Sequence, residues 1–140
     1  MEWVISCNVT EKFDIQTYLA ESNEICWRQR ANFSVGDIVY IYLSKTHQYI
    51  AYKTSVIATN ISLPQVCNRE LWNRCWISDE EYQKALDLNR FVLLQLEGRV
   101  DQNHSITWNE LKLMDCPRIQ GPVKLNECRS IIRDRIRSLF

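Results

Sequence analysis

Two neighbouring segments rich in β-branched and aromatic residues place the strongest constraint on the fold. Residues 38–43 read Ile-Val-Tyr-Ile-Tyr-Leu, and residues 49–58 are similar in character, after a polar interval at 44–48. Such side chains favour the half-buried, pleated surface of a strand. Polar turn residues between two strands indicate a hairpin. The sequence therefore predicts two long strands that pair antiparallel.

Side chains alternate between the two faces of a strand. In the first strand of the hairpin, Tyr40 and Tyr42 should therefore share one face, and Ile41 and Leu43 the other. We expect one of these two faces to line the interior of the sheet. The rings of Trp3, Phe13, Phe33 and Phe91 are expected in the hydrophobic core, as large apolar side chains usually are.

Further patterns extend the hairpin into a mixed domain. Short apolar runs predict strands at 3–7 and 91–96. Helices are expected where a polar cap precedes helically spaced apolar residues, at 10–19, 78–86, 107–114 and 126–139, the last three capped by Ser78, Thr107 and Asn126. The predicted class is α+β, with a strongly curved antiparallel sheet and helices at its ends.

Length and charge limit the architecture and the classes of partner. A chain of 140 residues without a Pro/Gly/Ser-rich linker is expected to form one domain, 1–140. Its 17 Lys and Arg balance 17 Asp and Glu, so any contact with nucleic acid must come from a local basic patch. No apolar run approaches the length of a membrane span. Glu2 and Trp3 stand where a signal peptide would be basic and apolar, which favours a cytoplasmic location.

Residues suited to catalysis or metal binding are few. The two histidines lie in predicted loops, and the pattern of a zinc-dependent deaminase is missing. The six cysteines lack Cys-x-x-Cys spacing, and the three glycines are isolated. We therefore expect no metal, no cofactor and no enzymatic activity, with most cysteines acting as small buried residues. A Cys/His nucleophile pair would meet only in the fold, so a Cys-dependent hydrolase is kept as a third alternative.

Trp27 differs from the other aromatic residues in its neighbours. It is followed at once by Arg28, Gln29 and Arg30, and shortly after by Asn32. A core strand would not tolerate so many unpaired polar groups, so a loop is expected. A ring that stacks on a base, with guanidinium and amide groups for phosphates or base edges, is typical of nucleic-acid binding. The alternative is an ordinary half-buried tryptophan.

The C-terminal segment is locally basic. Residues 118–140 contain six Arg and Lys against two acidic residues, a balance of +4. A helix with this charge can lie along phosphates. We favour the other interpretation, a solvated face opposite an apolar stripe that includes Ile132 and Ile136.

Taken in order, these segments resemble the EVE domain family, within the PUA-like fold that also includes the YTH readers of methylated RNA. Trp3-Val4-Ile5-Ser6 is similar to the aromatic-led first strand of that family. The stretch from Cys26 to Tyr42, with its Trp27 segment and Val35-Gly36-Asp37, looks like the family's tryptophan loop and central strand. Gln120-Gly121-Pro122 is similar to a segment that precedes the last helix in a bacterial branch. The middle of the chain, about 62–89, matches no family motif.

The resemblance implies a PUA-like curved antiparallel β-barrel with flanking helices, and an open pocket for a flipped or modified base of DNA or RNA. In that scheme Trp27 stacks on the base, Gln29 and Asn32 read its edge or fix the loop, and Ser6 and Asn8 add hydrogen bonds. Tyr42 or Tyr52 closes the aromatic cage. The expected binding residues are Ser6, Asn8, Trp27, Arg28, Gln29, Asn32, Tyr42 and Tyr52.

The leading hypothesis is a non-catalytic module that binds DNA or RNA and recognises a modified or extruded base. The rival, from a different functional class, is a protein-interaction or regulatory subunit, of a defence or toxin–antitoxin system, without base-binding activity. Binding that depends on salt and on Trp27 would distinguish the two.

Overall fold

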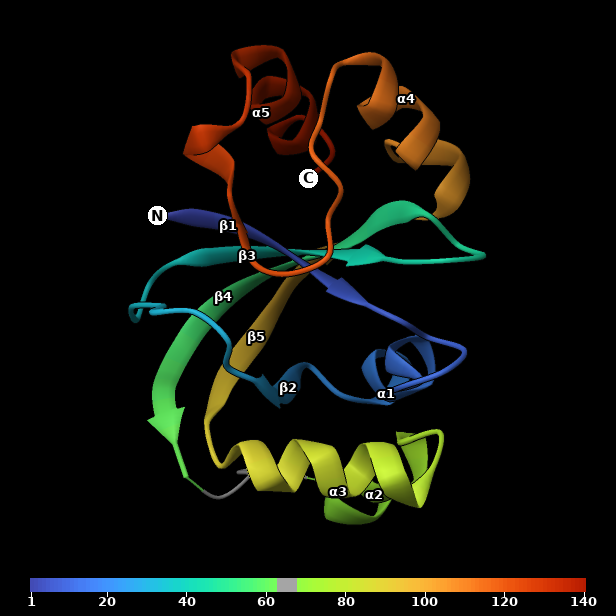
Figure 1. The fold of residues 1–140 in the computed structure, drawn as a ribbon, viewed down its shortest axis with the longest axis vertical. Coiled ribbons are helices and arrows are strands. Elements are labelled where there is room, and N and C mark those ends of the chain that lie inside the picture. The colour runs from blue at the N-terminus through green and yellow to red at the C-terminus, as the bar shows by residue number, and fades with distance from the viewer. Residues whose placement is uncertain (63–67) are drawn as a thin grey trace.

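A computed structural model describes residues 1–62 and 68–140 of the chain, and Pro64 and Cys67 lie outside these residues. Within the described residues, six strands form one sheet, with helices on either side (Figure 1). The strands are β1 (Glu2–Cys7), β2 (Glu24–Arg28), β3 (Ile38–Leu43), β4 (Tyr49–Ile61), β5 (Phe91–Arg99) and β6 (Val123–Lys124). The α-helices are α1 (Ile15–Glu21), α2 (Arg69–Cys75), α3 (Asp79–Leu88), α4 (Trp108–Leu113) and α5 (Ser130–Arg137), and 3-10 turns occur at η1 (Gln102–His104) and η2 (Leu125–Glu127).

The sheet is mixed rather than antiparallel throughout, and it is not closed into a barrel. Its strand order is β2-β5-β4-β3-β1-β6. The hairpin β3–β4 is antiparallel as predicted, but β1 runs parallel to β3. A parallel pair needs a crossover connection, and here α1 and β2 lie between the two strands in the sequence. Because β2 pairs with β5 and the short β6 pairs with β1, the ends of the sheet do not meet each other within the described residues.

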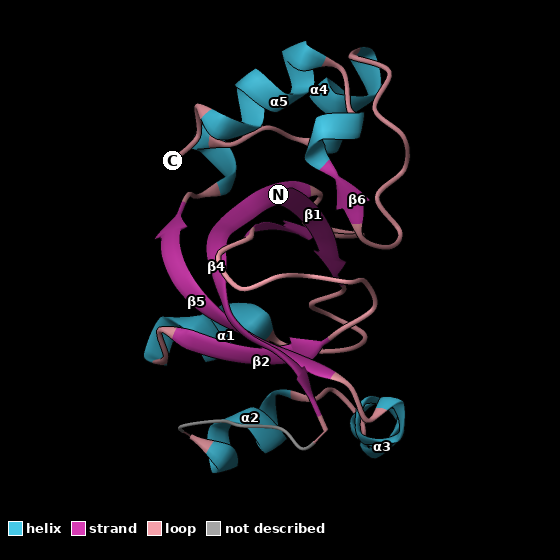
Figure 2. Ribbon diagram, turned by 90° about the vertical axis from the view of Figure 1, so that its left-hand side faces the viewer, coloured by secondary structure: helices cyan, strands magenta, loops and turns pink. Residues whose placement is uncertain are grey.

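Strong curvature brings distant strands of this open sheet toward each other. The register between β4 and β5 shifts three times, between Lys53 and Thr54, between Val56 and Ala58, and between Ala58 and Ile61. A bulge bends its strand and increases the local twist. Figure 2 shows β4 and β5 curling as they cross the molecule, with β2 carried round below β1.

Both faces of β3 are buried. The sequence had led us to expect that only one of them lines the interior of the sheet. Ile41 and Leu43 belong to the larger apolar core, within the curve of the sheet and under α1 and α2. Tyr40 and Tyr42 belong to a second core, where they pack with residues such as Ile132 of α5. Figure 1 shows α4 and α5 on one side of the sheet and α1, α2 and α3 on the other. A second helical layer therefore covers the face that a free barrel would expose.

Helix caps follow the predicted chemistry at two of three positions. The hydroxyl groups of Ser78 and Thr107 accept hydrogen bonds from the third residue after them, at the starts of α3 and α4. The prediction for Asn126 was wrong, because this residue lies in η2 and α5 begins at Ser130. The first helix also starts later than expected, at Ile15, with Asp14 as its cap. No helix within the described residues has the length and apolar character to cross a membrane.

The carboxylate of Asp37 joins the start of β3 to β1. It accepts hydrogen bonds from the Trp3 indole at 3.0 Å and the Ser34 amide at 2.9 Å, and it lies 3.3 Å from the Met1 amino group. Burial raises the pKa of Asp37, but these donors outweigh it and leave the pKa below its ordinary value. The charged form is therefore the one that the fold stabilises.

We expect Asp37→Ala to lower the free energy of unfolding at neutral pH by about 1–3 kcal/mol, because the buried indole and amide donors lose their acceptor. A group with a depressed pKa adds stability above its unfolded pKa, near 4, and this contribution is lost as the pH falls through the folded pKa. Urea unfolding at a series of pH values should therefore show the variant and the parent protein converging in acid. The exposed Asp87→Ala on α3 is the control. A constant difference at every pH would contradict this role.

Candidate functional site

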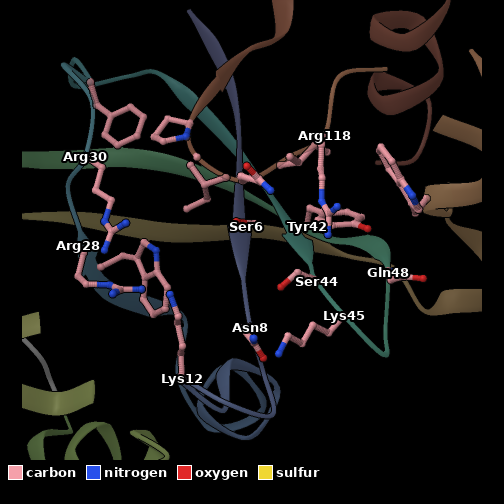
Figure 3. Close-up of a pocket in the computed structure, with 18 residues that line it drawn as sticks. Ser6, Asn8, Lys12, Arg28, Arg30, Tyr42, Ser44, Lys45, Gln48 and Arg118 are labelled. Carbon is pink, nitrogen blue, oxygen red and sulfur yellow. The ribbon is translucent and has the colours of Figure 1, made fainter. Parts of the chain in front are cut away.

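A pocket of about 550 Å³ opens where five segments of the chain meet. They are the end of β1 with the turn after it, the end of β2 with the chain after it, the end of β3 with the β3–β4 turn, the start of α4, and residues 118–122 before β6 (Figure 3). In the sheet, β1 and β2 are separated by three strands. Only the curl of the sheet allows both strands to line the same pocket. Its volume lies within the usual range for ligand sites.

Positive charge dominates this pocket. Among the described residues that line it, five are basic and none is acidic, the basic ones being Lys12, Arg28, Arg30, Lys45 and Arg118. The ammonium group of Lys45 forms an ion pair with Glu11, outside the lining. The chain as a whole has zero formal charge, so charge is segregated toward the pocket. Such a concave positive site attracts anions.

Trp27 lies in a strand and forms a wall of the pocket. The expectation of a loop was wrong: Trp27 belongs to β2, is only 5% exposed, and belongs to the larger core. Its ring is stacked on Trp76, with centroids 5.9 Å apart, and meets Phe13 edge-on. Most of the polar residues that argued against a strand, Gln29, Arg30 and Asn32, come after β2 ends at Arg28. The strand itself can therefore bury its aromatic side chain.

Arg28 lies half-buried against these rings. Its guanidinium carbon is 5.3 Å from the centroid of Trp27 and 5.8 Å from that of Trp76, which are cation–π distances. Burial lowers the pKa of Arg28, and the charge of Arg30 lowers it further. Among the described residues, the buried Arg28 Nε and the buried Trp76 Nε1 have no hydrogen-bond partner. Both atoms are donors, so neither can satisfy the other.

Gln29 and Asn32 support the pocket from behind instead of lining it. Gln29 is 1% exposed, and its side chain accepts from the Asn60 amide at 2.7 Å and donates to the Ala31 carbonyl at 2.9 Å. Arg90 donates to the side chains of Asn32 and Asn60 at 2.8 and 2.9 Å. Two roles were expected for these amides, reading a base edge or fixing the loop. Their hydrogen bonds in the structure are those that fix the loop. Asn60, within β4, has a positive φ of 54°, so this network also holds a left-handed backbone conformation in the strand.

Ser6, Asn8 and Tyr42 line the pocket, and Tyr52 does not. Asn8 accepts from the Glu11 amide and so orders the turn after β1. Burial raises the pKa of Tyr42 to about 12, while nearby Arg118 opposes that shift. Its hydroxyl is therefore a protonated donor at neutral pH. Tyr52 lies in the larger core, on β4.

Several lining residues were not predicted from the sequence. They come from the β3–β4 turn, α4 and the segment before β6: Ser44, Lys45, Gln48, Trp108, Arg118 and Ile119, with Gln120, Gly121 and Pro122. The last three form the Gln-Gly-Pro motif, which supported the family resemblance but was not assigned to the site. Arg118 lay in the basic segment, although its proximity to Tyr42 depends on the tertiary fold.

Other basic residues of the C-terminal segment are held by the protein itself. Arg129 pairs with Asp115, Arg135 with Glu110, and Arg137 with Glu2. These contacts support the interpretation of α5 as a solvated helix face. Arg118 is the member of this segment that lines the pocket.

The described cysteines and histidines show no activated group at the pocket. Burial raises the pKa of Cys7 to about 12 and that of Cys116 to about 11, which keeps both as thiols at neutral pH. His47 and His104 are not among the lining residues. No cluster of three metal-ligating side chains occurs in the part of the chain that the structure describes.

Comparison with solved structures identifies similar folds. An ASCH protein from Zymomonas mobilis has 15% sequence identity and a TM-score of 0.62, over 99% of this chain and 94% of that chain. Human THYN1, in complex with 5-methylcytosine-containing DNA, has 15% identity and a TM-score of 0.51, over 80% of this chain and 73% of that chain. No protein-family model and no curated protein sequence matches the chain. The likeness at this identity concerns the fold, and the chain has a PUA-like fold.

We expect Gln29→Ala to lower the free energy of unfolding by about 1–3 kcal/mol, since the Asn60 amide and Ala31 carbonyl lose a buried partner. Amide hydrogen exchange should accelerate most at Asn60 and in residues 29–34, and urea unfolding should give the total loss. Gln83→Ala, on the exposed face of α3, removes a similar side chain far from the pocket and should leave both measurements nearly unchanged. Unchanged exchange at Asn60 in the Gln29 variant would rule out the supporting role.

Proposed function

We propose that the pocket binds nucleic acid, taking in one flipped nucleotide, and that it does so without catalysing a reaction. The observation that carries this proposal is the combination of five basic and no acidic lining residues with aromatic walls. Cations match phosphate, and flat rings match bases of any sequence. A pocket that binds an uncharged metabolite would not need this concentration of positive charge.

The hydrogen-bonding groups of the pocket suit a base edge. Ser6, Asn8 and Gln48 offer both donors and acceptors, and the Tyr42 hydroxyl stays protonated. Because Trp27 is nearly buried, we infer that it forms the wall against which the base lies, rather than an exposed platform. Trp108 is half-buried and supplies another ring on the lining. Unstacking a base costs a few kcal/mol, which aromatic stacking of about 1–3 kcal/mol per base helps to offset.

In its more specific form, the proposal is that the flipped base is a modified one. We infer that the protein is a reader of modified bases of the EVE type. Human THYN1, of similar fold, is in complex with DNA that contains 5-methylcytosine. The resemblance to the EVE family, which leaves out about 62–89, adds support from the sequence. The absence of turnover is proposed because the described cysteines near the pocket are held as thiols and the histidines lie outside its lining.

Arg118→Gln should weaken binding to a short single-stranded oligonucleotide and make it less dependent on salt. Arg118 is exposed and lines the pocket, so the fold should tolerate its loss. Each phosphate contact contributes about −0.7 to the slope of log K against log salt for single strands, and fluorescence anisotropy at several salt concentrations measures it. Arg133→Gln on α5 makes the same change in net charge outside the pocket and should preserve affinity. Equal losses in both variants would point to bulk charge, and no binding by the parent protein would favour the protein-interaction alternative.

Base recognition should depend on Trp27. Alanine at this buried position would cost about 3–5 kcal/mol of stability, so Trp27→Phe is the better variant. Oligonucleotides that differ in one base, cytosine against 5-methylcytosine and a panel of other modified bases, should bind the parent protein with unequal affinity. Trp27→Phe should reduce that difference, with circular dichroism confirming the fold. Equal affinities across the panel would reject modified-base recognition and leave general nucleic-acid binding intact.

A further inference from the structure

We propose that Lys12, Arg28 and Arg30 form a subsite for a phosphate monoester, the dianionic end group of a nucleic-acid strand or of a nucleotide. The inference rests on the proposed function, because it assigns one side of the same pocket to a particular chemical group. It goes beyond that function in naming a terminal phosphate, whereas base recognition alone would involve the interior of a strand.

The three cations gather on one side of the pocket. Figure 3 shows Lys12, Arg28 and Arg30 on one side and Arg118 with Tyr42 on the other. The charge of Arg30 lowers the pKa of Arg28, and the charges of Lys12 and Arg28 both act on the thiol of Cys7, which places the three groups in one neighbourhood. The Arg118 charge acts on Tyr42. The pocket therefore has two basic regions.

Arg28 forms no ion pair with a carboxylate among the described residues. The carboxylate that acts on it, Glu81, has the smallest of the four effects on its pKa, and that residue is close to Lys84. The neighbouring charge of Arg30 is repulsive. The Nε of Arg28 is buried without a partner among the described residues, although its guanidinium is held against Trp27 and Trp76. An anion in this position relieves the repulsion and supplies an acceptor for charge-assisted hydrogen bonds.

A monoester fits this region better than a diester for two reasons. It carries a charge near −2 and three acceptor oxygens at neutral pH, whereas an internal diester carries one charge and has two free oxygens. A diester also continues into a sugar on both sides, and this side of the pocket is walled by the nearly buried ring of Trp27, against which Arg28 lies. A terminal phosphate has chain on one side alone, which leads back toward the region of Arg118 and Tyr42.

The test compares matched oligonucleotides that carry a 5′ phosphate, a 3′ phosphate or no terminal phosphate, by calorimetry at fixed salt. The phosphorylated end that fits should bind about ten-fold tighter than the unphosphorylated strand, the scale of a charge-assisted hydrogen bond. Arg28→Gln and Arg30→Gln should remove that advantage. Arg30 is exposed, so its variant remains informative if the Arg28 variant fails to fold. Arg118→Gln should weaken all three strands alike, and Arg74→Gln, exposed on α2, is the charge-matched control.

The outcomes separate this inference from the proposed function. Equal affinity for the three strands overturns the subsite and leaves nucleic-acid binding standing. An advantage that survives in Arg30→Gln and Arg28→Gln also overturns it. If a nucleoside monophosphate binds and no oligonucleotide does, the subsite holds and the nucleic-acid function fails. Inorganic phosphate in a parallel titration distinguishes a site for the bare anion from one that needs the attached nucleoside.

Discussion

The curvature imposed on β4 is the constraint on which the rest of this structure depends. This strand pairs with β3 on one side and β5 on the other, and its register against β5 shifts repeatedly. The resulting curl brings the end of β2 near the end of β1, although three strands separate them in the sheet. Without it, Trp27 and Ser6 would lie on distant parts of a flat surface. The sheet stays open, so its ends are available to line a pocket.

Segregated charge is the second organising feature. On the C-terminal helix, Arg135 and Arg137 are paired with acids from other parts of the chain, Glu110 and Glu2. At the pocket the balance differs, since five basic residues line it without an acidic one. A chain of zero formal charge thus keeps one concentrated positive region. Affinity for an anion then comes from a defined place instead of from the whole surface, which favours selectivity over non-specific binding.

Sequence patterns predicted local features well, and arrangements between distant residues less well. The β3–β4 hairpin and the caps at Ser78 and Thr107 follow from short-range chemistry. Trp27 was identified as unusual, but its place in a buried strand depends on Trp76, which lies far along the chain. Gln29 shows the same limit. The sequence left two roles open for its side chain, reading a base edge or fixing the loop, and only the folded protein shows its hydrogen bonds with Asn60 and Ala31.

By itself, the sequence determined the α+β class, the strand hairpin and the starts of α3 and α4, and it singled out the segment from Trp27 to Arg30 as a candidate site, because these depend on neighbours within a few residues. Only the tertiary structure decided that β1 and β3 run parallel, that both faces of β3 are covered, and that the sheet stays open. It also decided which side chains meet at the pocket, bringing Arg118 in and leaving Tyr52 out. The physical reason is that the curl of the sheet is the sum of small bends over many residues, and no local sequence motif predicts any one of these bends.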